Sequence, residues 1–150
     1  MFLPTTTTTD KELIHYVKEL NIPNFRGVKM RDELPAKTRK TECGILNLET
    51  TQENGSHWVA WYKDDKECYY FDSFAEPPPL EILQYLKTPQ ELILDIPVIK
   101  RNAVTVQHDT SNECGSLCVY VLKHLSNGRS YSSILETLQD RYQNPRPLTI

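Results

Sequence analysis

Apolar residues recur at helical spacing in four separate stretches of the chain. The predicted helices cover residues 11–20, 80–86, 115–125 and 132–142. In the first helix, Leu13, Val17 and Leu20 share one face, and Asp10 stands where an N-cap is expected. Asn127 and Gly128 follow the third helix and terminate it, since both residue types are typical of helix C-termini.

Runs of aromatic and β-branched residues predict strands between the first two helices. We expect these strands at residues 44–49, 57–63 and 67–74. Asp64 and Asp65 form a hairpin turn, which makes the second and third strands antiparallel neighbours. Two further strand segments are indicated, a weaker one at residues 97–99 and a better one at residues 103–107. Residues 21–41 are expected to form an irregular connection.

The order of these elements predicts an α+β fold. A mostly antiparallel central sheet would be flanked by helices, because the strands cluster early and the longest apolar helices come late. The 150 residues are enough for one domain with its own core, and we find neither repeats nor a linker. We expect residues 1–9 and 145–150 to be tails.

Composition narrows the class of protein without identifying it. With 17 basic and 20 acidic residues, the net charge of −3 does not favour a nucleic-acid partner. No apolar run approaches the roughly 18 residues of a membrane-spanning helix, and the first ten residues do not resemble a secretory signal. We therefore expect a protein that is not secreted, with four reduced cysteines.

Cys114 is the cysteine with the clearest chemical potential. It stands where a polar loop becomes an apolar helix, so its sulfur would face unpaired N–H groups and the positive end of the helix dipole. Both favour the nucleophilic thiolate. Taken alone, Cys114 is equally consistent with a buried structural cysteine. Cys118 lies one turn later within an apolar stripe, and we expect it, like Cys43 and Cys68, to be a packing residue.

His57 and Asp72 are candidates for the base and its partner. His57 opens one strand, and Asp72 closes the strand that a tight hairpin joins to it. Antiparallel pairing places both at the same end of the sheet. A catalytic imidazole needs an acceptor that orients its second nitrogen. The alternatives are a structural histidine and a surface aspartate at a strand end.

Gln107 precedes Cys114 by seven positions, at the end of an expected strand. Its neutral amide can donate a hydrogen bond to a developing oxyanion, with the backbone N–H of Cys114 as a second donor. Nucleophile, base, orienting group and oxyanion donor together satisfy the needs of acyl transfer by a thiol.

These residues resemble those of the adenovirus-type (adenain-like) cysteine proteases. The likeness rests on three blocks: Gly55-Ser56-His57-Trp58, Tyr70-Phe71-Asp72-Ser73-Phe74, and Gln107 followed by Cys114-Gly115. That family shares a clan with the Ulp-type SUMO and ubiquitin-like proteases. The resemblance covers about residues 10–125. Within it, residues 24–35 look most like proteases of Maverick/Polinton elements and adintoviruses.

The resemblance implies a papain-like fold with a permuted His-Asp-Cys order, and it implies roles for six residues. Cys114 would be the nucleophile, His57 the base, Asp72 the orienting group and Gln107 an oxyanion donor. Trp58 and Gly115 would contact substrate. It implies no cofactor and no metal. Substrates would be protein precursors with Gly near the scissile bond, cleaved by a monomer in the host cytoplasm or nucleus or in the virion.

Departures from the adenovirus pattern concern activation. Adenovirus-type proteases are activated by DNA and by a peptide that attaches through a cysteine. Residues 97–103 contain no cysteine and the net charge is negative, so DNA activation is not favoured, although basic residues between Lys29 and Lys40 leave it open. An activating peptide also remains an open alternative. The chain would correspond to a near-minimal protease core.

Two other functions remain open alternatives. A deconjugating or processing protease for ubiquitin-like proteins would share the catalytic residues and differ in its substrate surface. A non-enzymatic module could instead bind zinc through Cys114, Cys118, His108 and His124, although the spacing is only loosely that of a zinc site.

Overall fold

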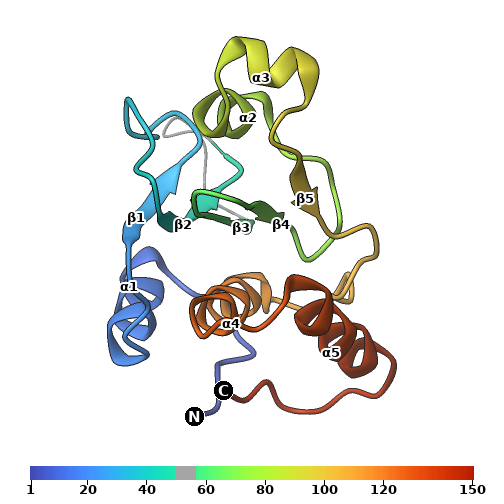
Figure 1. The fold of residues 1–150 in the computed structure, drawn as a ribbon. Coiled ribbons are helices and arrows are strands. Elements are labelled where there is room, and N and C mark those ends of the chain that lie inside the picture. The colour runs from blue at the N-terminus through green and yellow to red at the C-terminus, as the bar shows by residue number, and fades with distance from the viewer. Residues whose placement is uncertain (50–56) are drawn as a thin grey trace.

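A five-stranded sheet lies between two groups of helices in the computed structural model, which describes residues 1–49 and 57–150 (Figure 1). The elements, in chain order, are α1 (Asp10–Glu19), β1 (Phe25–Met30), β2 (Glu42–Asn47), β3 (Trp58–Lys63), β4 (Cys68–Phe71), α2 (Leu80–Leu86), α3 (Pro89–Leu94), β5 (Ile99–Arg101), α4 (Cys114–Ser126) and α5 (Tyr131–Gln143). None of the described helices is long and apolar enough to span a bilayer.

The sheet is antiparallel at its centre and parallel at both edges. The strand order is β1-β2-β3-β4-β5, where β2, β3 and β4 pair antiparallel while β1 and β5 add in parallel. The predicted α+β class is confirmed, and the expected hairpin joins β3 to β4. The edges make the sheet mixed rather than mostly antiparallel.

Each face of the sheet packs against different helices. Ile45, Ala60 and Phe71 belong to the core shared with α1, α4 and α5. Leu46 and Trp61 point to the other face and form a second core with α2. Because both faces are covered, β2 is buried at every position, including the polar Glu42 and Asn47 at its two ends.

The four predicted helices are present, with small shifts at their ends. Thr9 caps α1 instead of Asp10, because the Thr9 hydroxyl accepts from the Glu12 N–H while the Glu12 carboxylate accepts from the Thr9 N–H. The prediction missed α3, a six-residue helix that Thr88 caps in the same way.

Two predictions were wrong: one predicted strand is not formed, and one segment predicted to be irregular contains a strand. Residues 103–107 form no strand; β5 lies earlier, at the position of the weaker signal near Ile99. The Asn102 side chain binds the backbone of Asp72 on both sides and so ends the pairing with β4. The segment expected to be irregular contains β1, which is half-buried throughout and includes Gly27 at φ +113°. A strand of this kind lacks alternation in its sequence.

The ends of the chain are packed, unlike the tails expected for residues 1–9 and 145–150. Leu3 and Leu148 are buried in the main core, and the Leu3 N–H donates to the Leu148 carbonyl at 2.8 Å. The Ser116 hydroxyl of α4 donates to the Pro4 carbonyl at 2.6 Å. The N-terminal segment therefore runs along the beginning of α4.

Candidate active site

Cys114 is the first residue of α4, the central helix of the main core. The side chain is buried, with 8% of the residue exposed. The preceding loop delivers the thiol to the helix end where backbone N–H groups lack intrahelical partners. The Gly115 N–H is one of the groups that stabilise a charged sulfur at this position.

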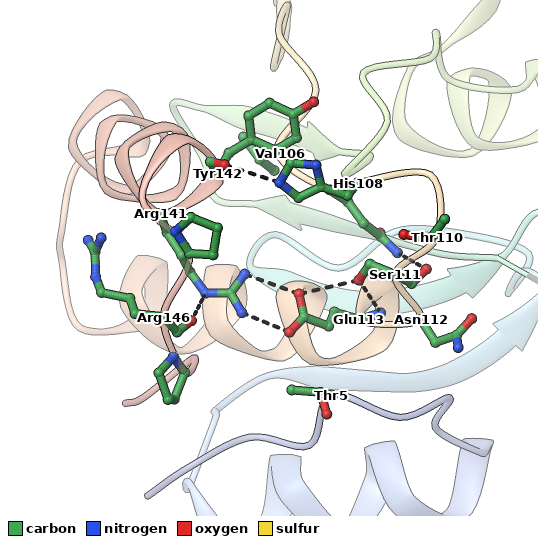
Figure 2. Close-up of a pocket in the computed structure, with 13 residues that line it drawn as sticks. Thr5, Val106, His108, Thr110, Ser111, Asn112, Glu113, Arg141, Tyr142 and Arg146 are labelled. Carbon is green, nitrogen blue, oxygen red and sulfur yellow. Dashed lines mark hydrogen bonds and ion pairs between the residues drawn. The ribbon is translucent and has the colours of Figure 1, made fainter.

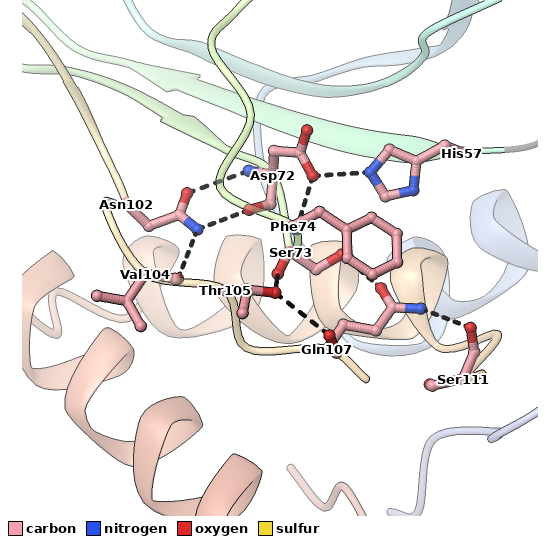
Figure 3. Close-up of polar contacts among 9 residues, drawn as sticks. All are labelled: His57, Asp72, Ser73, Phe74, Asn102, Val104, Thr105, Gln107 and Ser111. Carbon is pink, nitrogen blue, oxygen red and sulfur yellow. Dashed lines mark hydrogen bonds and ion pairs between the residues drawn. The ribbon is translucent and has the colours of Figure 1, made fainter. Parts of the chain in front are cut away.

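His57 and Asp72 meet at one end of the sheet. His57 directly precedes β3 and Asp72 directly follows β4, so the antiparallel register brings them together, with Nε2 of His57 2.7 Å from Oδ1 of Asp72 (Figure 3). The imidazole also stacks on Phe74, with ring centroids 4.9 Å apart. The predicted proximity of the two side chains is therefore seen in the structure.

The Asp72 carboxylate is held in place by its own backbone neighbours. Oδ1 accepts a second hydrogen bond from the Phe74 N–H at 2.8 Å. The Asn102 amide accepts from the Asp72 N–H at 3.2 Å and donates to the Asp72 carbonyl at 2.6 Å (Figure 3). The role of Asn102 could not be predicted from the sequence, because its partner Asp72 lies 30 positions earlier and no local pattern indicates the contact.

Electrostatics favour a charged pair of His57 and Cys114. Burial by itself lowers the pKa of His57, but hydrogen bonds to Asp72 and to Cys114 outweigh it and raise that pKa from 6.5 to about 9. Burial acts to raise the pKa of Cys114, but the hydrogen bond with His57 and the backbone N–H groups of Trp58 and Gly115 lower it below 9.0. Both shifts favour the form of the pair in which Cys114 is a thiolate and His57 an imidazolium.

The other three cysteines have the opposite character. Burial raises the pKa of Cys43 to about 12 and that of Cys68 to about 11. It raises the pKa of the fully buried Cys118 well above its ordinary value. All three therefore remain neutral thiols in apolar surroundings, which leaves Cys114 as the one cysteine suited to nucleophilic attack.

Gln107 is buried, and its amide has a fixed orientation. Its Oε1 accepts from the Ser73 hydroxyl at 2.5 Å, and its Nε2 donates to the Ser111 carbonyl at 2.9 Å (Figure 3). A side-chain amide nitrogen carries two hydrogens, so one N–H remains to donate after the bond to Ser111. This donor comes from the same loop that leads to Cys114.

Trp58 and Gly115 lie against the N-terminal segment. The Trp58 indole N–H donates to the Thr8 carbonyl at 3.0 Å. A Cβ at position 115 would overlap the Thr8 hydroxyl and lie 3.2 Å from the Trp58 ring, so only glycine permits this packing. Trp58 also lines a pocket of about 370 Å³ with residues that include Asp10 and Lys29. Contact of either residue with substrate stays a prediction.

Part of the first sequence block lies outside the described residues. Gly55 and Ser56, which precede His57 in that block, belong to residues 50–56. The geometry above rests on His57 and the residues that follow it.

The four residues considered as a zinc site do not form one among residues 1–49 and 57–150. His108 stacks on Tyr142, with ring centroids 4.1 Å apart. His124 packs on Tyr120, and Cys118 is fully buried in the main core. The interactions of these side chains are therefore those of packing residues.

Comparison with known folds places this arrangement in one structural class. The chain superposes on the crystal structure of the African swine fever virus protease with a TM-score of 0.59, over 93% of this chain and 67% of that one, at 16% identity. It superposes on the SUMO protease Ulp1 with a TM-score of 0.51, over 91% and 75% of the chains, at 15% identity. The predicted fold class is confirmed, because the chain shares the fold of these two proteases.

Sequence comparison gives relatives of the same kind, whereas no family model matches the chain. The chain is 28% identical over 142 residues to an African swine fever virus protein named SUMO-1 cysteine protease, covering 85% of this chain and 51% of the relative. It is 29% identical over 130 residues to the protease of Bovine adenovirus 2, covering 79% and 63%. The chain thus spans about half the length of the swine fever virus relatives.

Proposed function

We propose that this chain is a cysteine endopeptidase with Cys114 as nucleophile and His57 as general base and acid. Asp72 orients the imidazole, and Gln107 with the Cys114 N–H forms the oxyanion hole. The observation that carries the proposal is a single imidazole that joins a buried carboxylate, at 2.7 Å, to a thiol at a helix N-terminus. The names of the similar viral proteins give it further support.

Acylation begins from the thiolate and imidazolium. The sulfur of Cys114 attacks the peptide carbonyl carbon, a C–S bond forms, and the carbonyl electron pair moves to oxygen. The N–H groups of Gln107 and Cys114 receive this oxyanion. As the carbonyl reforms, the C–N bond breaks and His57 gives its proton to the leaving amine. A thioester and neutral imidazole remain.

Deacylation restores the charged pair. Neutral His57 removes a proton from water, and the resulting hydroxide attacks the thioester carbon. The second oxyanion collapses with cleavage of the C–S bond, which releases the carboxylic acid and returns thiolate and imidazolium. Asp72 stabilises the imidazolium and keeps the ring in one orientation throughout.

The proposed substrates are precursor proteins of a virus or a virus-derived element, cleaved after small residues, with Gly near the scissile bond. Support comes from the viral relatives and from the likeness of residues 24–35 to Maverick/Polinton and adintovirus proteases. We propose a monomeric enzyme of the host cytoplasm or nucleus, or of the virion. Its net charge of −3 disfavours activation by DNA, whereas an activating peptide remains part of the proposal to be tested.

Removal of the thiol tests the catalytic proposal. We expect Cys114→Ala to abolish hydrolysis of a fluorescence-quenched peptide that contains Gly at the scissile bond. Cys68→Ala is the matched control, because Cys68 lies in the core on the opposite face of the sheet, and it should retain hydrolysis. In the wild-type protein iodoacetamide should modify Cys114 first, as read by peptide mass mapping. Hydrolysis that persists in Cys114→Ala would refute the assignment.

A second candidate is processing of ubiquitin-like proteins, favoured by the likeness to Ulp1 and by the name of the swine fever virus relative. A SUMO or ubiquitin probe ending in a Gly-Gly aldehyde separates the two functions. Rapid modification of Cys114 by such a probe, without cleavage of viral precursor peptides, would favour deconjugation. Precursor cleavage without probe modification would favour maturation.

A further inference from the structure

The last helix contacts the residue that precedes the nucleophile. Arg141 of α5 forms a two-pronged ion pair with Glu113, with Nη2 2.7 Å from Oε1 and Nη1 3.1 Å from Oε2 (Figure 2). Both side chains are only 12% exposed. Glu113 is the N-cap residue of α4, although its own side chain does not cap the helix. Its carboxylate is instead held by α5.

This ion pair continues to the proposed oxyanion donor through Ser111. The Ser111 hydroxyl donates to Glu113 Oε2 at 3.3 Å and accepts from the Glu113 N–H at 3.2 Å. The carbonyl of the same Ser111 accepts from Gln107 Nε2 at 2.9 Å (Figure 3). Arg141, Glu113, Ser111 and Gln107 therefore form one continuous chain of polar contacts.

The loop that carries these contacts is not packed flat against α5. A pocket of about 600 Å³ opens between them, lined by loop residues that include Gln107, Ser111 and Glu113 and by residues of α5 and the C-terminal segment. Across it the loop is held by the ion pair and by His108, which stacks on Tyr142 and hydrogen-bonds its carbonyl at 3.1 Å. Arg141 is itself anchored, because its Nε donates to the Arg146 carbonyl at 2.8 Å.

The charged pair of Cys114 and His57 is held by different contacts. Asp72 and Phe74 hold the imidazole, and the N–H groups of Trp58 and Gly115 stabilise the sulfur. None of these groups belongs to the loop of residues 107–113. Movement of that loop would thus displace the Gln107 donor of the oxyanion hole while leaving the nucleophile and its base in place.

We propose that Arg141 is a positioning residue for the oxyanion hole, acting through Glu113 and Ser111. The proposal rests on the proposed function. Oxyanion donors act only when they lie at hydrogen-bonding distance from the developing charge, so a shift of the loop lowers kcat with little effect on KM. Thiolate reactivity, which needs no oxyanion, is independent of Arg141.

The test compares Arg141→Gln with Asp140→Asn. Asp140 is the neighbouring residue of α5 and forms an exposed ion pair with the Arg146 guanidinium, whereas Arg141 is anchored by the Arg146 backbone carbonyl. Asp140→Asn therefore keeps every contact of Arg141 and is a matched control. Two reactions are followed on each variant of the 150-residue chain: hydrolysis of a Gly-containing peptide and alkylation of Cys114 by iodoacetamide. For Arg141→Gln we expect kcat to fall about 10- to 100-fold, with KM and the alkylation rate close to wild type. Asp140→Asn should match the wild type in all three.

Two results would overturn the proposal: an unchanged kcat in Arg141→Gln, or an alkylation rate that falls in parallel with kcat. If Arg141→Gln does not fold, Arg141→Lys decides, because it keeps the charge and loses the two-pronged contact; its kcat should be intermediate, and wild-type kcat would refute the proposal. Failure of the proposed function is a separate outcome, since wild-type protein would then hydrolyse no peptide.

Discussion

Among the residues that the structure describes, the buried carboxylates are those of Glu42 and Asp72, and their surroundings differ. Glu42, at the start of β2, accepts hydrogen bonds from Arg26, the Arg39 N–H, Trp61 and Tyr85. Asp72, after β4, accepts from His57 and the Phe74 N–H, and its Oδ2 has no hydrogen-bond partner among the described residues.

The partners of a buried carboxylate decide whether its charge serves structure or chemistry. The partners of Glu42 include an arginine, which is permanently charged, and donors that do not titrate near neutral pH, so its environment is the same throughout a reaction. The main partner of Asp72 is an imidazole, whose charge changes as protons move. The first region therefore suits a structural ion pair, and the second suits the proposed catalysis.

The largest effect should come from Asp72→Asn. Loss of the carboxylate removes the partner that orients and charges His57, and we expect kcat/KM for peptide hydrolysis to fall about 10³- to 10⁴-fold. Thermal unfolding should change far less than activity does. The control is Asp109→Asn, an exposed change in the loop before Cys114, which should retain wild-type activity. Full activity in Asp72→Asn would remove the distinction between the two regions.

Glu42→Gln should show the opposite pattern. Removing one charge of a buried ion pair leaves Arg26 without its counter-charge, which costs about 3–5 kcal/mol of unfolding free energy. Urea denaturation measures this loss. Activity per folded molecule should remain that of the wild type, and a selective loss of kcat in protein that is still folded would contradict a purely structural role.

The pH dependence should distinguish the Asp72 region further. The rate of Cys114 alkylation should rise as pH increases through the lowered pKa of the thiol. His57 should lose its imidazolium proton as pH rises through its raised pKa of about 9. Because that pKa is raised from 6.5, the His57 contribution to stability is fully present below 6.5 and is lost as pH rises through about 9. In Asp72→Asn the alkaline limb of kcat/KM should move to lower pH. An unmoved limb would assign it to another group.

The smallest effect should come from Tyr85→Phe. It removes a single hydrogen bond to Glu42, at 2.6 Å, and leaves the other donors in place. We expect a loss of about 1 kcal/mol in unfolding free energy, measured in urea, with unchanged kcat/KM. A loss as large as that of Glu42→Gln would show that the donors around Glu42 act as one cooperative network.

Local patterns were sufficient for the elements that carry the candidate site. Helical spacing predicted α4, and the two aspartates after Lys63 predicted the hairpin that brings His57 to Asp72. Both follow from contacts between residues close in sequence. β1 was missed because an edge strand that is half-buried throughout shows no alternation, and residues 103–107 were misassigned because the Asn102 side chain replaces the strand pairing there.

By itself the sequence determined which residue types stand at the ends of which elements, because hydrophobic periodicity and turn residues act over a few positions. Only the tertiary structure decided the rest. It lowered the pKa of Cys114 and raised the pKa of the three other cysteines, brought Thr8 against Trp58, and joined Arg141 to Glu113 across 28 positions. Burial and charge pairing depend on groups that are distant in sequence, so these properties exist only once the chain has folded.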